Sequence, residues 1–186
     1  MTLEQDPKPP MRQIEHGEPR GTVGRFSLRA DLCEWPNGDR GRYAVFDGPS
    51  SVLVVPVFED GRTVLVRQWR YPWGATSWEV VAGTRELDED ASDCAVRELE
   101  EEAGLRAERL TPLGLVRPSA TTTTVQHVFL AQELSRTEAR LETYERDMIR
   151  REVPLAEALA AALDGVIVHA GSVSALSRVS RAVGLI

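Results

Sequence analysis

The feature that most constrains how this chain folds is an acidic segment that runs from Glu79 to Glu102. Ten acidic residues in it face only two basic ones, a net charge of −8, whereas the whole chain of 186 residues carries −7. The rest of the protein is therefore close to neutral. Within the segment, Glu98 and Glu101 lie three residues apart and Glu98 and Glu102 four apart, so on a helix all three share one face within about 6 Å of axial rise.

Carboxylates gathered on one helix face repel one another unless water or a cation compensates them. Two interpretations follow from these residues alone. The face is either solvated, as most charge runs are, or it binds a divalent cation such as Mg²⁺ or Mn²⁺, which takes oxygen ligands at about 2.1 Å and keeps several waters. The opposite side of the helix, with Val96, Leu99 and Ala103, is predicted to pack on the core.

The helix that carries these acids is predicted to span about Ala91 to Ala103. Asp90 precedes it in a position suited to an N-cap, and Gly104 follows it as a residue that tolerates the left-handed conformation of a helix C-terminus. Cys94 falls inside the helix, where we expect a small, buried packing residue.

The spacing around the helix matches a known signature at every fixed position. Gly83 is followed after five residues by Glu89, and after seven more by "RELEEEAGL", which begins at Arg97. The chain thereby resembles the Nudix hydrolases. The resemblance implies an α+β fold, an α/β/α sandwich with a mixed sheet between helices, that holds a metal site on a loop–helix–loop.

The same resemblance implies roles for individual residues. The carbonyl of Ala82 and the carboxylates of Glu98, Glu101 and Glu102 would bind Mg²⁺ or Mn²⁺. Glu101, Glu98 and Arg97 would form the catalytic set. Arg97 would also pair with Glu89 to hold the loop against the helix, and Gly83 would turn the Ala82 carbonyl toward the metal.

A second stretch, "LVRQWRYPWGATSWEVVAG" from Leu65 to Gly83, looks like the ADP-ribose pyrophosphatase and nucleotide-sugar branch of that family. This implies hydrolysis of the pyrophosphate bond of ADP-ribose, or of a related nucleoside diphosphate sugar, to a nucleoside monophosphate and a sugar phosphate. Arg70, Trp69 and, across a homodimer, Arg42 would bind substrate. The alternatives are a surface ion pair for Arg70 and core or interface packing for the tryptophans.

Other functions stay open at this point. Within the family, GDP-mannose, dinucleoside polyphosphates and oxidised nucleotides are competing substrates. Outside catalysis, the chain would be a sensor that binds a nucleotide sugar without turning it over.

The segment "VRPSATTTTVQHVFLA", from Val116 to Ala131, departs from this branch because it has no carboxylate where a catalytic or water-holding glutamate is expected. Glu98 or Glu101 would then act as the base, or Gln126 or His127 would orient the water, or the enzyme would be slow. The competing interpretations are a structural hydrogen bond for His127 and a plain strand for the threonine run, which would otherwise line a pocket with neutral donors.

The chain divides by its pattern into three parts: a disordered or extended arm over residues 1–20, a dimerising β subdomain over 21–50 and the Nudix domain over 51–186. "EDG", at residues 59–61, is predicted to close a hairpin, and two later helices are expected from about Pro154 and about Ser172. Two distant cysteines indicate a reducing cytoplasm. The modest basic content and the lack of an apolar run of about 20 residues argue against a nucleic acid polymer and a membrane as partners.

Overall fold

The computed structural model describes residues 11–139 and 147–186, and they form two compact units. One unit is Met1–Pro49 with Ser119–Thr124, and the other is Ser50–Pro118 with Val125–Ile186. Strand structure begins at Arg12, earlier than the predicted start of the β subdomain at residue 21. Residues 1–10 of the predicted arm lie outside the described residues.

The larger unit contains a four-stranded mixed sheet in the order β8-β5-β10-β9. Its strands are β5 (Ser51–Pro56), β8 (Val81–Thr84), β9 (Leu105–Val116) and β10 (Gln126–Arg136). β5 and β10 run parallel, and the other two pairs are antiparallel. A second sheet, antiparallel throughout, has the order β11-β6-β7. Its strands are β6 (Arg62–Arg70), β7 (Ala75–Glu79) and β11 (Ile149–Pro154).

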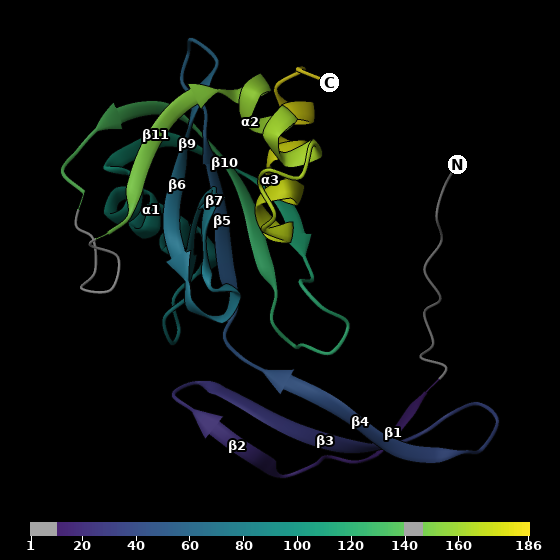
Figure 1. Cartoon of the computed structure of the whole chain (residues 1–186). Helices are drawn as coiled ribbons and strands as arrows, with labels where there is room; N and C mark the ends of the chain where they lie inside the picture. The colour runs from purple at the N-terminus through teal and green to yellow at the C-terminus, as the bar shows by residue number, and fades with distance from the viewer. Residues whose placement is uncertain (1–10, 140–146) are drawn as a thin grey trace. The chain divides into compact units, whose positions relative to one another are not determined.

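Alternation along β5 explains why helices cover both sides of the mixed sheet. Leu53 and Val55 belong to a hydrophobic cluster with residues of α2 (Leu155–Leu163) and α3 (Ala170–Ala182). Val52 and Val54 point the other way, into a cluster with Cys94, Ala95 and Leu99 around α1 (Ala91–Glu98). Successive side chains of a strand point to opposite faces, so a strand buried on both faces needs a helical layer on each. Figure 1 shows α1 on one side of the strands and α2 and α3 on the other, which confirms the α/β/α Nudix sandwich.

The acidic helix extends over the predicted residues, with a change of pitch. α1 continues into a π-helical turn, η2 (Leu99–Ala103), and ends at Gly104, which has φ +65°. Asp90 occupies the N-cap position, but its side chain makes no capping hydrogen bond. The predicted packing of Val96 is wrong, because Val96 is exposed while Cys94 is buried. A π turn adds a residue to the turn, so positions before and after it do not keep one helical phase.

The predicted hairpin around "EDG" is only half correct. The turn exists, because Gly61 has φ +80° and Val57 bridges Thr63. The two flanking strands nevertheless belong to different sheets: β5 pairs with β8 and β10, whereas β6 pairs with β7 and β11. Both edges of β5 are occupied by other partners, so β6 continues into the second sheet. A short Gly-containing connection therefore predicts the turn but not the pairing.

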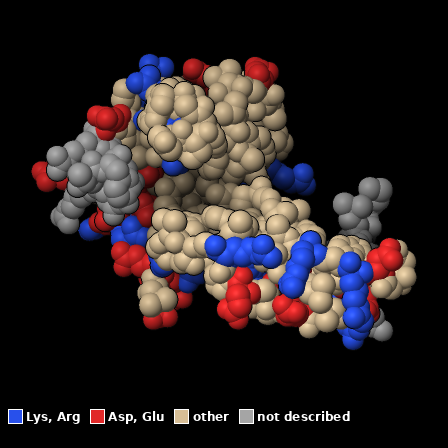
Figure 2. Space-filling view, turned by 60° about the horizontal axis from the view of Figure 1, so that its bottom comes forward, with Lys and Arg blue, Asp and Glu red and all other residues tan. Residues whose placement is uncertain are grey.

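In the smaller unit, β3 (Phe26–Glu34) is the central strand. β4 (Arg40–Asp47) pairs with one of its edges, and β1 (Arg12–Glu15) and β2 (Pro19–Val23) pair with the other. "PNG" forms the turn between β3 and β4, with Gly38 at φ +86°. Basic and acidic side chains are interspersed over the face of the molecule seen in Figure 2. Among the described residues, no helix has the length and apolar character needed to cross a bilayer.

Candidate active site

The site forms where the C-terminal half of the acidic helix packs against β8. Glu98 is buried, and its carboxylate lies directly against Gly83. A Cβ at position 83 would overlap that carboxylate, so the Glu98 side chain can occupy this position only because residue 83 is glycine. One residue earlier, the amide of Ala82 donates to Oε2 of Glu102 at 2.9 Å, and Glu102 is 1% exposed.

Arg97 holds the acidic side chains together. Its Nη1 donates to Oε1 of Glu98 at 2.7 Å and to Oε2 of Glu101 at 2.9 Å. Its Nε and Nη2 donate to the two oxygens of Glu89 at 2.9 Å and 3.1 Å. Glu98 and Glu101 thus converge on a single cationic atom, which shows that their oxygens point into one common space. The pair of Arg97 and Glu89, which spans loop and helix, is present in the structure.

The field inside this cluster is strong enough to shift several pKa values. Hydrogen bonds from Arg97 and from the Glu86 amide lower the pKa of Glu89 to about 2, against a smaller opposing effect of burial. The bonds from Arg97 to Glu89, together with the charge of Glu98 and the bonds to Glu101 and Glu98, raise the pKa of Arg97 against an opposing effect of burial. Burial, together with the nearby carboxylates of Glu89 and Glu98, raises the pKa of the Cys94 thiol to about 12. Cys94 is therefore an inert packing residue at neutral pH, as predicted.

The donor set fits a hard divalent cation. Carboxylates and a main-chain carbonyl are the ligands that Mg²⁺ and Mn²⁺ prefer. In the arrangement seen over residues 11–139 and 147–186, no three acidic, histidine or cysteine side chains are grouped tightly enough to hold one ion. Glu98 and Glu101 are held instead by Arg97, and Glu102 by the Ala82 amide. The guanidinium supplies positive charge at the position where the two carboxylates converge.

Arg70 lies at the end of β6 and forms a bidentate ion pair with a fully buried carboxylate. Its Nε and Nη2 donate to Glu79 at 2.8 Å and 2.5 Å. His169, the N-cap residue of α3, places Nδ1 at 3.3 Å from Glu79 and at 2.8 Å from Oγ of Ser172. Burial alone would raise the pKa of Glu79, but the bonds from Arg70 and the nearby His169 outweigh it, so the pKa is lowered. The planar fork of Arg70 is thereby fixed in orientation.

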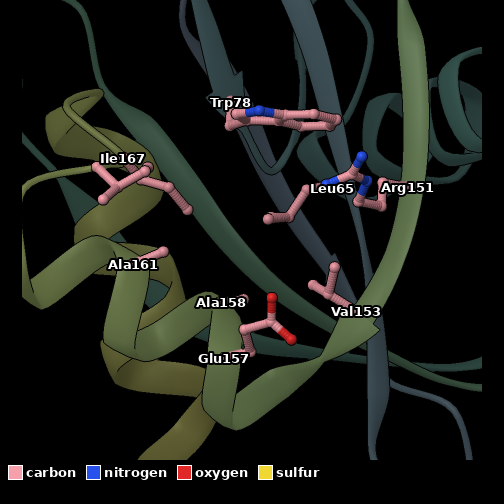
Figure 3. A pocket seen from close by; sticks show the side chains of 9 residues that line it. Leu65, Trp78, Arg151, Val153, Glu157, Ala158, Ala161 and Ile167 are labelled. Atoms are coloured by element: carbon pink, nitrogen blue, oxygen red, sulfur yellow. The ribbon is translucent and has the colours of Figure 1, made fainter.

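The tryptophans differ in exposure. Trp69 and Trp73 are 59% and 48% exposed, and Trp73 lies tilted against the His169 ring. Trp78 instead packs against the core on the α2 and α3 side. There it forms one wall of a small pocket of about 130 Å³, with the guanidinium of Arg151 5.4 Å from its ring centroid (Figure 3). Trp78 therefore has the packing role that was the alternative prediction.

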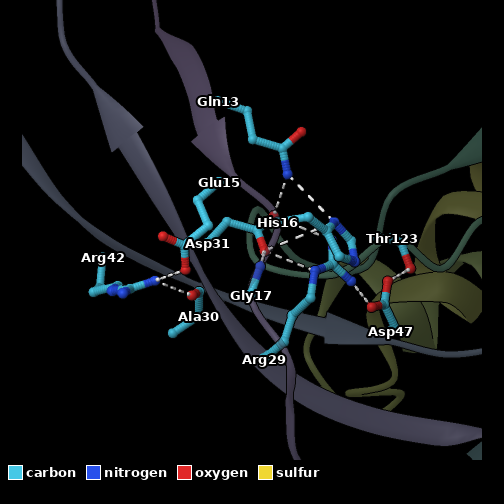
Figure 4. Close-up of polar contacts among 10 residues, drawn as sticks. All are labelled: Gln13, Glu15, His16, Gly17, Arg29, Ala30, Asp31, Arg42, Asp47 and Thr123. Atoms are coloured by element: carbon cyan, nitrogen blue, oxygen red, sulfur yellow. Dashed lines mark hydrogen bonds and ion pairs between the residues drawn. The ribbon is translucent and has the colours of Figure 1, made fainter.

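Arg42 lies on β4 of the smaller unit, where its Nη1 donates to Glu15 and to the carbonyl of Ala30, both at 3.2 Å (Figure 4). The threonine run also belongs to this unit. Thr122 and Thr123 donate their hydroxyls to the Phe46 carbonyl and to Asp47, which itself pairs with Arg29. The hydroxyls of Thr122 and Thr123 thus anchor the loop to β4.

Two polar residues of the larger unit have roles that the sequence did not reveal. Arg85 donates to the carbonyl of Glu89 through Nε at 2.8 Å and so closes the loop that precedes α1. His169 completes the buried group around Glu79, although 90 residues separate the two. The role of Arg85 could have been predicted, because it is a basic residue inside an acidic loop. The role of His169 has no counterpart in the nearby sequence, since only tertiary packing brings α3 to β7.

The NUDIX domain family matches residues 48–174, more than half of the chain. The chain is 37% identical over 136 residues to an ADP-ribose pyrophosphatase of Bacillus subtilis (strain 168), covering 72% of this chain and 74% of that protein. It is 34% identical over 151 residues to an ADP-ribose pyrophosphatase of Mycobacterium tuberculosis (strain ATCC 25618 / H37Rv), covering 77% and 71%. A crystal structure of an ADP compounds hydrolase superposes with a TM-score of 0.81 at 22% identity, covering 95% of this chain and 96% of that one.

These matches agree with the geometry of the acidic helix. The α/β/α sandwich and its loop–helix–loop define the class of protein, which is that of the Nudix fold. The match over residues 48–174 shows that the chain belongs to the Nudix family.

Proposed function

We propose that this protein hydrolyses the pyrophosphate bond of ADP-ribose, or of a related nucleoside diphosphate sugar, to a nucleoside monophosphate and a sugar phosphate. The observation that carries the proposal is the convergence of Glu98 and Glu101 on one cationic point beside Gly83. The two pyrophosphatases that share more than 30% identity with most of this chain support the substrate class.

The metal is part of the same proposal. Glu98, Glu101, Glu102 and the carbonyl of Ala82 would hold Mg²⁺ or Mn²⁺, which would neutralise phosphate charge and lower the pKa of water. Phosphoryl transfer depends mainly on positioning and on charge neutralisation. An acidic protein would otherwise repel a dianionic substrate, and a cation held by the glutamates reverses the local sign.

The chain's own residues would do the rest. Arg97, fixed by Glu89, holds Glu98 and Glu101 in position relative to one another. Arg70, whose fork is fixed by Glu79, is oriented to donate to phosphate or ribose oxygens. Trp69 is exposed next to it in sequence and offers a flat surface for the substrate. Arg42 would contribute from the second protomer of a dimer.

We also propose a homodimer formed through the smaller unit. An apolar row, consisting of Phe26, Leu28 and Phe46, is exposed on one face of its sheet, and the two phenylalanine rings stack at 5.7 Å. A second copy of this chain would cover it. A cytoplasmic location is the last part of the proposal, and the two free, buried cysteines support a reducing compartment.

A turnover assay tests the function. The purified chain with Mg²⁺ or Mn²⁺ would receive ADP-ribose, GDP-mannose, a dinucleoside polyphosphate and an oxidised nucleotide. Glu101→Gln and Glu102→Gln should each lower kcat by about 10²-fold or more, in line with the loss of charge stabilisation. Glu100→Gln is the matched control, because Glu100 directly precedes Glu101 in sequence but pairs with Arg106.

The outcomes separate the alternatives. Cleavage of ADP-ribose that both substitutions abolish supports the proposal. If another compound of the panel is cleaved instead, that compound is the substrate. Binding without product formation identifies a sensor. Product formation that neither substitution changes would overturn the assignment of the acidic helix as the metal site.

A further inference from the structure

The first turn of α3 contacts two consecutive residues at the junction of β7 and β8. Ser172 Oγ accepts a hydrogen bond from the amide of Val80 at 3.0 Å, and Nδ1 of His169 lies 3.3 Å from Oε2 of Glu79. His169 and Ser172 are also joined to each other, with Nδ1 2.8 Å from Oγ. These four residues therefore form one connected polar group, although α3 and β7 are far apart in the sequence.

The role of His169 in this group is not that of a helix cap. It occupies the N-cap position of α3, where a polar side chain usually accepts an amide of the first turn, but its side chain makes no capping hydrogen bond. Its Nδ1 faces Glu79 instead. Burial lowers the pKa of His169, with the charge of Glu79 opposing this and the charge of Arg70 adding to it, so the ring is neutral at pH 7. A neutral ring with its proton on Nδ1 donates toward the ionised carboxylate.

The neighbouring side chains pack against the His169 ring. Trp73 of η1 (Tyr71–Trp73) lies tilted against it, with the two ring centroids 6.2 Å apart. Gly171 allows a second close approach, because a Cβ at this position would lie 3.2 Å from Cε1 of His169 and 2.7 Å from Oε1 of Gln126. Packing from η1, α3 and β10 thus keeps Nδ1 beside Glu79.

The orientation of Glu79 decides where Arg70 points. Glu79 is fully buried, and Arg70 donates to its two oxygens through Nε and Nη2. Leaving such a carboxylate unpaired in the interior is costly, so Arg70 stays on Glu79 and the opposite edge of its guanidinium, at Nη1, faces away from the carboxylate. The Arg70 side chain is 33% exposed, so part of it reaches the surface. Any residue that fixes Glu79 therefore also fixes Arg70.

We infer that His169 is a positioning residue for substrate binding, which fixes the carboxylate of Glu79 and, through it, the fork of Arg70. The inference rests on the proposed hydrolase function, in which Arg70 donates to phosphate or ribose oxygens. His169 acts through Glu79 and takes no part in the chemical step. Its loss should therefore weaken the binding of substrate and leave the rate of the bound complex almost unchanged.

Steady-state kinetics of the full chain with Mg²⁺ and ADP-ribose test this role. His169→Phe keeps a ring against Trp73 but removes the nitrogen that faces Glu79. Members of one hydrogen-bond network are coupled by a factor of about two to a hundred, and we expect KM to rise about fivefold with kcat within about twofold. His169→Asn places an amide nitrogen where Nδ1 lies and should restore most of the affinity. The matched control is His16→Phe, because the His16 side chain is 68% exposed on the smaller unit.

A double-mutant cycle separates the positioning of Arg70 from a general structural effect. If His169 acts through Arg70, His169→Phe should change KM by less than about twofold in an Arg70→Lys background, where the fork is already lost. An unchanged KM in His169→Phe alone, or an equal rise in both backgrounds, would overturn the inference while leaving hydrolysis intact. Thermal melts show whether each variant is folded. If the Phe variant does not fold, His169→Ala, which adds no bulk, replaces it in the cycle.

Failure of the proposed function gives a different result, because wild type would then not turn over ADP-ribose. Calorimetric titration of ADP-ribose in the presence of EDTA measures the same contact without catalysis. Binding that His169→Phe weakens about fivefold would support the role of His169 in a protein that binds without hydrolysing, and equal binding would overturn it. Neither turnover nor binding by wild type would overturn the function and this role together.

Discussion

Nε of Arg97 donates to Oε1 of Glu89 at 2.9 Å, and this ion pair joins the helix to the loop that precedes it. The guanidinium keeps Glu89 ionised down to a pKa of about 2, well below its ordinary value of 4.5. A carboxylate whose pKa is lowered by folding stabilises the native state above its unfolded pKa and loses that contribution as pH falls toward the folded one.

The pair therefore predicts an acid-dependent loss of stability. Glu89→Gln should lower the free energy of unfolding by about 1–3 kcal/mol at pH 7, since a charged hydrogen bond is lost. The difference from wild type should shrink toward zero between pH 4.5 and pH 2. Chemical denaturation at a series of pH values measures it, with the exposed Glu108→Gln as control. A difference that stays constant across this window would show that Glu89 is not titrating against Arg97.

Gly83 predicts a change in activity without a comparable change in stability. A Cβ at this position would meet the end of the Glu98 side chain, which can move aside, and not backbone. Gly83→Ala should therefore displace Glu98, lowering kcat by about 10²-fold because positioning is lost, while Tm changes by only a few degrees. Gly21→Ala is the control, since a Cβ there meets nothing within 4 Å. Wild-type kcat in Gly83→Ala would contradict the close packing seen here.

Local patterns in the sequence were sufficient to predict the acidic helix and its ends. Gly104 adopts the left-handed conformation, and Leu99 is buried, as the spacing indicates. The layer of helices on each side of the sheet also followed from the family resemblance that this spacing carries. The acidic helix and its ends are set within about 25 residues of chain, where residues close in sequence are also close in space.

Features set by long-range packing were not predictable in this way. β5 and β6 are joined by a short turn but enter different sheets, because both edges of β5 are occupied by strands from elsewhere in the chain. His169 reaches Glu79 only through the docking of α3. The threonine run anchors to β4 through a bridge between Phe46 and Thr122, 76 residues away. The hydrophobic pattern of a segment does not indicate which distant segment it will contact.

Arg70 predicts an effect on substrate affinity. Lysine keeps the charge but cannot form the bidentate bond to Glu79 or present a fork to a phosphate. Arg70→Lys should raise KM for the nucleotide sugar about tenfold and change kcat by less than threefold. The control is Arg67→Lys on the same strand, which lies over Trp78 and would keep its cation–π contact. An unchanged KM in steady-state kinetics would indicate that the pair of Arg70 and Glu79 is purely structural.

The apolar row on the smaller unit predicts the oligomeric state. Leu28 lies directly opposite Phe46 across the β3–β4 pair, and the two are 48% and 43% exposed. If a second copy covers this face, the wild-type chain should sediment as a dimer at micromolar concentration. Leu28→Glu would bury a charge in that contact and should give a monomer, since an unpaired buried carboxylate costs several kcal/mol.

Thr22→Glu is the control, because it adds the same charge to the opposite face of the sheet. Thr22 pairs with Ser27, and Ser27 points away from the face of its neighbour Leu28. A dimer is expected to survive that change, and a wild-type monomer in the same experiment would refute the proposed interface.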